Sequence, residues 1–374
     1  ANAFDVRLKN IANTHVIKLG SDLLALWEAS SPYSLNPNTL ETNGLSDLKG
    51  VLKKGEAFSA HPRFDPGHHK DQRMVTFGVS TGPKSTIRLM EFSTEGENIG
   101  SLLSDRKDSF NGFAFLHDFA ITPNWAIFLQ NAIEFNPLPY LIGQKGAAQC
   151  LKSKKNGQAK LLLIPRDSGC FAGQEPKVCN APNGFVFHHL NAYENNDKII
   201  LESIFYSDFP SIGPDDDFRQ INFDQIPEGK LKRCIINTKQ KEIKISTISE
   251  QCCEFAMVNP RKQGKYAQYA WMASSEQKVG NGPLQAIKKI DLKNNTEYIW
   301  SAAPRGFVNE PLMIPSTSSD LEDDGWVIVL IWNGERLGTD LIILKANDLS
   351  EQAILELPIS IPYGLHGSWV SESN

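Results

Sequence analysis

The chain of 374 residues lacks several features that would assign it quickly to a functional class. It has no run of about 18 uncharged apolar residues, which argues against a membrane-spanning helix. Basic residues are not in excess, because 38 Lys and Arg stand against 43 Asp and Glu and give a net charge of −5. Nucleic acid is therefore not an expected partner. Neither a GxGxxG nor a GxxxxGK[ST] phrase indicates a nucleotide site.

Cysteine is scarce, and the six cysteines form no CxxC pair. This spacing gives no support for a zinc ribbon or a disulfide framework. Nothing near the first residue resembles a signal peptide. We therefore expect reduced thiols and a cytoplasmic location.

Short β-rich runs separated by turn residues are abundant, and many strands at such spacing are typical of a sandwich, a barrel or a propeller. No internal repeat selects the propeller among these. The ten clearest runs are residues 23–30, 73–80, 86–93, 125–132, 159–166, 198–206, 242–249, 266–273, 326–333 and 340–347.

Four histidines lie in separate phrases, within or at the end of strand-like runs next to turn residues. They are His61 in AHPRFDP, His117 in FLHDFAITPNW, His188 in FHHLNAYE and His366 in YGLHGSW. A shell of four neutral imidazoles without thiolate or carboxylate is unlike a structural zinc site and suits iron(II) with open positions better. Their wide separation demands a fold that brings distant strand ends to a common axis, as a propeller does.

These phrases resemble the carotenoid cleavage oxygenases, and further similarity lies in ANT, LLALWE, NPNTLET, CEFAMVNP, NEPLMIP and DDGWV. The likeness extends along most of the chain and is greatest to the bacterial, cyanobacterial-type apocarotenoid oxygenases. It implies a single all-β domain over residues 1–374, a seven-bladed propeller with short helices and loops forming a cap over the iron face. It also implies that the N-terminal portion of the family domain lies outside this numbering.

The resemblance assigns roles residue by residue. The four histidines above would bind Fe(2+), and Glu28, Glu254 and Glu310 would orient His117, His188 and His366, leaving His61 without a carboxylate. A metal-bound imidazole normally donates its other N–H to such a partner. The alternative for these glutamates is a structural salt bridge or turn. Thr14, in ANTH, matches the position of a small side chain beside an open coordination site, although β-propensity alone could explain a threonine there.

The other histidines are set aside. His189 should point to the opposite face from His188, because side chains alternate along a strand. His68 and His69 lie in a charged loop and should be solvated, and His15 has no assigned role. Phe113 and Phe115 should share the face of His117 and could line a substrate tunnel, whereas Phe187 should point away from His188. Trp125, Phe185 and Trp369 could line the tunnel or belong to the core.

Two segments interrupt the strand rhythm. Residues 133–153 combine large apolar side chains with two prolines before a short predicted helix. They could contact a membrane, with Leu138 and Leu141 as candidates beside Phe135, Tyr140 and Ile142, or form a buried cap over the active-site face. Residues 207–230 read as a long loop, either a lid or a solvated excursion.

The resemblance implies iron(II)-dependent cleavage of a conjugated C=C bond in a carotenoid or apocarotenoid, with O2 as co-substrate and two carbonyl products of the apocarotenal or retinal type. It implies peripheral membrane contact and no obligate protein partner. Two alternatives are a non-oxidative carotenoid or retinoid isomerase and a carotenoid-binding protein without turnover. Two carbonyl products, one isomer or an unchanged polyene would distinguish these three functions.

Overall fold

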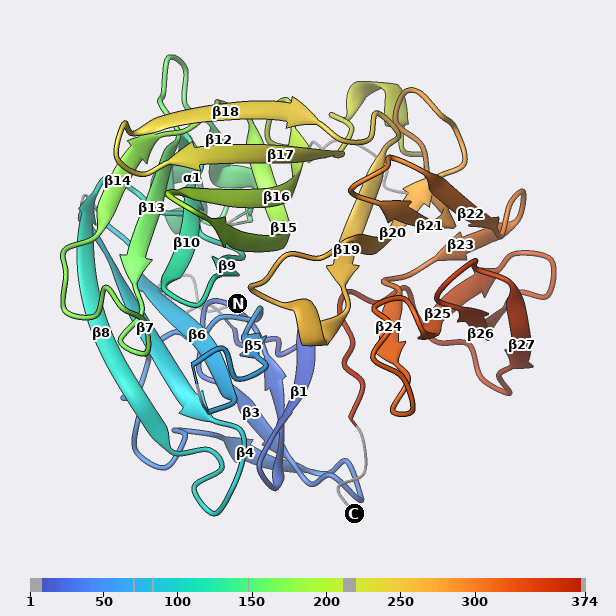
Figure 1. Ribbon diagram of the computed structural model, residues 1–374, viewed down its shortest axis with the longest axis horizontal. Helices are drawn as coiled ribbons and strands as arrows, with labels where there is room; N and C mark the ends of the chain where they lie inside the picture. The colour runs from blue at the N-terminus through green and yellow to red at the C-terminus, as the bar shows by residue number, and fades with distance from the viewer. Residues whose placement is uncertain (1–8, 70, 83, 147, 211–219, 371–374) are drawn as a thin grey trace.

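The computed structural model describes residues 9–69, 71–82, 84–146, 148–210 and 220–370, and its architecture is a β-propeller built almost entirely of antiparallel sheets. Figure 1 shows these sheets arranged around a common centre, at which the inner end of each sheet lies. The part of residues 207–230 that falls in 211–219 lies outside the described residues.

Six sheets of four or five strands make up the ring. The first comprises β1 (His15–Leu19), β2 (Asp22–Leu26), β3 (Tyr33–Leu35) and β4 (Thr42–Leu45). The second comprises β5 (Arg63–Asp65), β6 (Arg73–Ser80), β7 (Lys84–Ser93) and β8 (Leu102–Asn111). The third comprises β9 (Ala120–Ile121), β10 (Trp125–Gln130), β13 (Lys160–Pro165) and β14 (Lys177–Asn180).

The remaining three sheets follow in chain order. The fourth comprises β15 (Phe185–Asn195), β16 (Lys198–Tyr206), β17 (Lys230–Asn237) and β18 (Glu242–Thr247). The fifth comprises β19 (Cys253–Val258), β20 (Tyr269–Ser275), β21 (Leu284–Asp291) and β22 (Glu297–Ser301). The sixth comprises β23 (Gly306–Val308), β24 (Leu312–Pro315), β25 (Gly325–Asn333), β26 (Gly338–Lys345) and β27 (Glu351–Glu356). Three single turns of 3-10 helix, η1 (Ala148–Cys150), η2 (Phe223–Gln225) and η3 (Pro260–Lys262), lie between strands.

A separate hydrophobic cluster fills each interface between consecutive sheets, from the first to the sixth. No such cluster joins the sixth sheet to the first within the described residues. Instead, apolar side chains of β24, β25 and β26 line a shallow hollow of about 270 Å³, which Trp369 also borders. Trp326 and Trp369 there are 45% and 60% exposed, so this sheet face is not covered by described residues.

An insertion between β10 and β13 carries the segment that interrupts the strand rhythm. It forms a two-stranded ribbon of β11 (Ile133–Phe135) and β12 (Leu151–Ser153), with α1 (Pro137–Leu141) between them. Asn136 caps α1 by accepting a hydrogen bond from the Leu138 N–H, and Pro137 occupies the first helical position, where its missing N–H costs nothing. No residue of α1 is buried, so α1 itself does not form a buried cap, whereas Ile133 and Cys150 of the same segment are buried.

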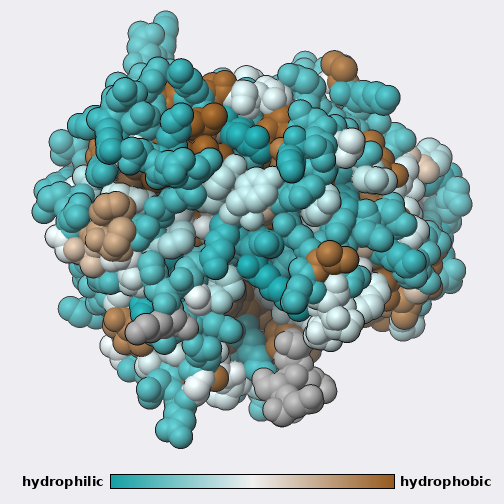
Figure 2. Space-filling view, viewed as in Figure 1, coloured by the Kyte–Doolittle hydropathy of each residue, from teal (hydrophilic) through white to brown (hydrophobic). Residues whose placement is uncertain are grey.

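The ten strand runs predicted from the sequence all coincide with strands, namely β2, β6, β7, β10, β13, β16, β18, β20, β25 and β26. All six cysteines, which lie in the described part of the chain, are free thiols. Among the described helices, none has the length and apolar character needed to cross a membrane. The face of the molecule in Figure 2 is mainly hydrophilic and is hollowed near its centre.

Candidate metal centre

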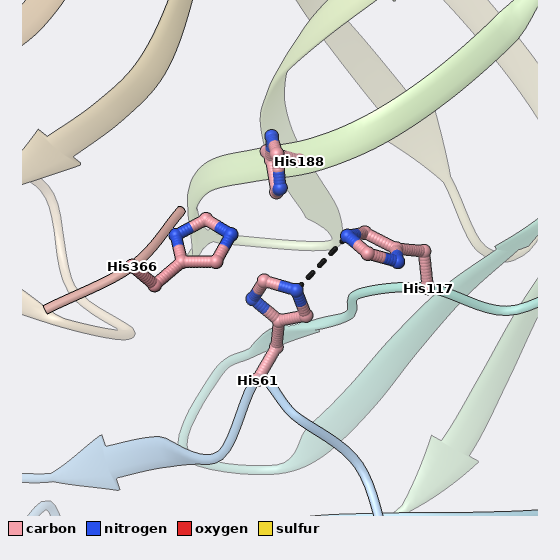
Figure 3. Close-up of side chains that lie close together, drawn as sticks. All are labelled: His61, His117, His188 and His366. Carbon is pink, nitrogen blue, oxygen red and sulfur yellow. Dashed lines mark hydrogen bonds between the residues drawn. The ribbon is translucent and has the colours of Figure 1, made fainter. Parts of the chain in front are cut away.

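Four imidazoles from four separate parts of the chain converge at the centre of the ring (Figure 3). His61 precedes β5 and His117 precedes β9, so each stands just before the inner strand of its sheet. His188 lies inside β15, and His366 lies in the segment that returns to the centre after β27. One ring nitrogen from each of the four histidines lies within 4.8 Å of the others.

The orientation of these nitrogens suits a cation. His61 Nε2 and His117 Nε2 are 3.0 Å apart, a contact that is repulsive between two lone pairs and is relieved by a proton or a metal ion. His188 Nε2 is buried and has no hydrogen-bond partner. A buried polar atom without a partner is costly unless a ligand satisfies it. The four-nitrogen set therefore fits a metal that favours imidazole, and both thiolate and carboxylate are absent from it.

A carboxylate lies beside the Nδ1 atom of each of three imidazoles. Glu254 Oε2 accepts from His188 Nδ1 at 2.6 Å, and Glu310 Oε1 accepts from His366 Nδ1 at 2.9 Å. Glu28 Oε1 lies 3.5 Å from His117 Nδ1, too far for a well-formed hydrogen bond. With Nδ1 protonated toward the carboxylate, Nε2 of His188 and of His366 presents a lone pair toward the centre.

Charge and burial oppose each other in these pairs. Burial acts to raise the pKa of Glu254, but His188 and the hydrogen bonds outweigh it and hold the pKa below its ordinary value. Burial acts to lower the pKa of His188, whereas Glu254 raises it above the ordinary value. For His61 burial and the neighbouring histidines act together, and its pKa falls well below the usual range. His61 is thus an uncharged imidazole near neutral pH, as metal binding requires.

A second network, which the sequence did not reveal, fixes the backbone next to three of the histidines. The buried Asp118 carboxylate accepts from the backbone N–H groups of His189 and Phe119 and pairs with Arg63. Arg63 in turn donates to the carbonyl oxygens of His189 and Phe119. These groups adjoin His61, His117 and His188 in sequence, so the network fixes three ligand segments to one another. In the sequence, Arg63 stands two residues after His61 and Asp118 directly follows His117, but neither position indicated such a network.

The family model described as retinal pigment epithelial membrane protein matches residues 1–371. The apocarotenoid-15,15'-oxygenase of Synechocystis is 44% identical over 98% of this chain and 74% of its own length. The structure of cobalt-substituted Synechocystis ACO superposes with a TM-score of 0.93, covering 98% of this chain and 76% of that one.

The chain belongs to the carotenoid cleavage oxygenase family. This is a family of non-haem iron enzymes with a four-histidine centre. More distant relatives include resveratrol cleavage oxygenase 1 of Aspergillus fumigatus, 27% identical over 99% of this chain and 75% of its own. The isoeugenol monooxygenase of Pseudomonas putida is 25% identical over 98% of this chain and 76% of its own.

In this family member β15 departs from a regular strand at its histidines. Its pairing with β16 shifts register between Val186 and His189 and again between His189 and Asn191. These bulges break strict alternation, so Phe187 does not point away from His188 as predicted: the two ring centroids lie 6.1 Å apart, and the Phe187 ring lies edge-on to His117 at 5.4 Å. His189 does face the other way, where Nδ1 meets the Ser203 hydroxyl at 2.6 Å.

Aromatic rings form a connected series that starts at the centre. Phe187 contacts Phe185, with ring centroids 4.5 Å apart, and Phe185 contacts Phe115 at 6.2 Å. Phe113 stacks on Phe135 at 5.9 Å, close to α1. Phe113, Phe115 and His117 are all partly exposed, whereas the residues between them are buried, so these three share one face of their segment.

The other residues singled out in the sequence differ in their burial. Thr14 is buried, and its carbonyl oxygen accepts from the His366 N–H at 3.1 Å. The prediction that His68 is solvated is wrong, because its side chain is fully buried and Nε2 lies 2.6 Å from the Gln263 carbonyl oxygen. His69 is exposed, as expected. Trp125 belongs to a core cluster, whereas Trp369 borders the open sheet face.

Proposed function

We propose that this protein cleaves a conjugated C=C bond of an apocarotenoid or carotenoid with O2, using one Fe(2+) held by His61, His117, His188 and His366. The observation that carries the proposal is the convergence of four imidazole nitrogens within 4.8 Å, backed by carboxylates that set their tautomers. The 44% identity to an apocarotenoid-15,15'-oxygenase favours an apocarotenal substrate and a retinal-type product.

A ferrous ion would supply the redox chemistry that activates O2, which zinc cannot supply. The residues of the chain have a different task. The histidines would hold the ion, Glu254 and Glu310 keep His188 and His366 in one tautomer and orientation, and Glu28 lies beside His117. The buried Thr14, bonded through its backbone to His366, would restrict the space beside one open position.

The aromatic series from Phe187 through Phe185 and Phe115 suits a polyene, which has no hydrogen-bonding groups along its length and is held by apolar contact. Phe113 and Phe135 extend the apolar lining toward α1. We propose that the substrate enters on this side and that the depth of the path selects the bond that is cut.

The exposed side of α1 supports peripheral membrane contact. Leu138, Leu141 and Ile142 are 62%, 49% and 58% exposed, and they lie beside the partly buried Phe135 and Tyr140. An exposed apolar group of this kind marks an interaction surface. A polyene resides in lipid rather than water, so a surface that contacts lipid near the substrate path would aid its transfer.

We also propose that the complete ring has seven blades, of which the six sheets are six. The open apolar face of the sixth sheet, with Trp326 and Ile343, supports this number, because a propeller protects such faces by closing. A further sheet would stand between the sixth and the first.

The function is tested by incubating the iron-loaded protein with a panel of apocarotenals, carotenes, resveratrol and isoeugenol. Oxygen uptake and product masses are measured together. The proposal predicts one O2 consumed per polyene cleaved and two carbonyl products whose carbon counts sum to that of the substrate. A single isomer formed without oxygen would establish the isomerase instead, and an unchanged, tightly bound polyene would establish a carrier.

A further inference from the structure

His15 is a fifth histidine at the centre of the ring and is not part of the four-nitrogen set. It begins β1, and its ring centroid lies 5.7 Å from that of His366 and 6.4 Å from that of His61. Its Nδ1 lies 2.9 Å from the carbonyl oxygen of Ala60, the residue before His61. Its Nε2 lies 2.9 Å from the Ser368 hydroxyl and 3.2 Å from the Gly367 carbonyl oxygen.

Both ring nitrogens have partners. Nδ1 and Nε2 each lie within hydrogen-bond distance of a carbonyl oxygen, which only accepts: that of Ala60 for Nδ1 and that of Gly367 for Nε2. When Nδ1 carries the proton and donates to Ala60, Nε2 accepts from the Ser368 hydroxyl. One neutral imidazole thus connects two segments that lie far apart in the sequence, and it uses both of its ring nitrogens to do so.

These two segments are the ones that carry His61 and His366. The segment after β27 contains no strand between residues 357 and 370, so few backbone ladder bonds hold His366 in place. The His366 N–H donates to the Thr14 carbonyl oxygen, and the Gly367 N–H donates to Glu310. The network of Asp118 and Arg63 connects the segments of His61, His117 and His188 but does not reach His366.

We propose that His15 is a positioning residue that fixes the His366 segment to the His61 segment and so holds the fourth imidazole at metal distance. This inference rests on the proposed iron site. Without this connection the centre would retain three well-placed histidines and a fourth that departs more readily. His15 would then control how fast the metal is released rather than which metal is preferred.

The test compares wild type, H15F and S368A with the matched control H69F, which changes an exposed histidine that lies 2.8 Å from the Pro123 carbonyl oxygen. Each iron-loaded protein is mixed with excess chelator and the rate of iron release is followed. We expect H15F to release iron roughly 10–100-fold faster than wild type, as for other residues that orient a metal ligand. S368A should also release iron faster, and the double variant no faster than H15F.

A second readout needs no metal. In the metal-free proteins, chymotrypsin cleavage after Tyr363, Leu365 or Trp369 should be faster in H15F than in wild type, because the segment is freed. H15Q is the rescue variant, since the glutamine amide can reach the Ser368 hydroxyl and should restore slow cleavage and slow iron release. If H15F folds poorly, H15A replaces it.

Iron release and cleavage by H15F within twofold of those of H69F would overturn the proposal. A wild-type protein that binds no iron would instead refute the proposed function, and the cleavage comparison would still show whether His15 holds the segment.

Discussion

The three glutamates behind the histidines are not equivalent. Glu254 has a short hydrogen bond to His188 and also accepts from the Tyr206 hydroxyl at 2.6 Å and from the Phe255 N–H at 2.8 Å. Glu28 has only the 3.5 Å contact to His117 and is partly exposed. Glu254 therefore has the most hydrogen bonds of the three, and Tyr206, which no sequence motif marked, is one of its donors.

Replacing Glu254 should weaken the centre without removing a ligand. For E254Q we expect iron affinity or turnover to fall roughly 10–100-fold, because the amide no longer accepts from His188 as a carboxylate does. Y206F should have a smaller effect in the same direction. Iron titration against a competing chelator measures both, with E242Q, at an exposed position of the outer strand β18, as a control. Affinity and turnover equal to wild type in E254Q would show that this glutamate is structural.

His68 predicts a pH dependence of stability that does not involve the metal centre. Burial lowers its pKa below the ordinary value of 6.5, despite the opposing charge of Asp65, and Nδ1 is buried without a partner. The folded state therefore keeps His68 neutral while the unfolded chain takes up a proton near pH 6.5. The contribution of His68 to the free energy of unfolding is present above pH 6.5 and is lost as the pH falls through and below that value.

Urea unfolding of wild type and H68Q at pH 7.5 and pH 5 measures this contribution. Wild type should lose more stability than H68Q on acidification. An equal loss in both would mean that His68 titrates alike in the folded and unfolded states.

At the scale of elements, the strands of the ring were predictable and the details of β15 were not. Nine of the ten predicted runs are middle strands, whose largely buried side chains give apolar runs, and the tenth is the exposed outer strand β18. Outer strands such as β8 and β27 were missed, since one or both faces are solvated and their composition is polar. The bulges of β15 depend on pairing with β16, which local sequence does not encode.

The network around Asp118 connects separate elements and should be costly to disrupt. Asp118 is 4% exposed, and D118N would leave the partly buried Arg63 without its counter-ion. We expect a loss of about 3–5 kcal/mol in the free energy of unfolding, the usual cost of breaking such a pair. The surface pair of Asp197 and Lys239 is the matched control, and D197N should cost less than about 1 kcal/mol. Urea unfolding of the metal-free proteins measures the loss of stability in D118N and in D197N. Similar losses would show that the network around Asp118 does not stabilise the fold more than a surface ion pair does.

The insertion with α1 yields a prediction about membranes. L138D with L141D should reduce binding to liposomes and uptake of lipid-embedded substrate, while cleavage of detergent-dispersed substrate should be spared. Leu321 and Leu337, each 69% exposed elsewhere on the surface, provide a control pair, and L321D with L337D should bind liposomes like wild type. Liposome flotation measures this. Equal flotation of both double variants would exclude α1 from membrane contact.

At the scale of the whole molecule, the sequence phrases led to the family and to the four histidines, because their chemistry is local and distinctive. The sequence could not show that the segment after β27 returns to the centre of the ring. There His366 approaches Thr14 and His15, and that contact depends on the arrangement of all the sheets between them. For the same reason the contacts of His15 with Ala60 and Ser368 could not be predicted from the sequence.

The central claim is that one iron ion is bound by four histidines and by no other side chain. The most direct measurement is the iron content per chain of wild type, of the variants H61A, H117A, H188A and H366A, and of H189A and H69A as controls. We expect one iron per chain in wild type and in both controls, and a marked loss of iron in each of the four variants. Full iron content in H61A or H366A, together with its loss in H189A, would contradict it.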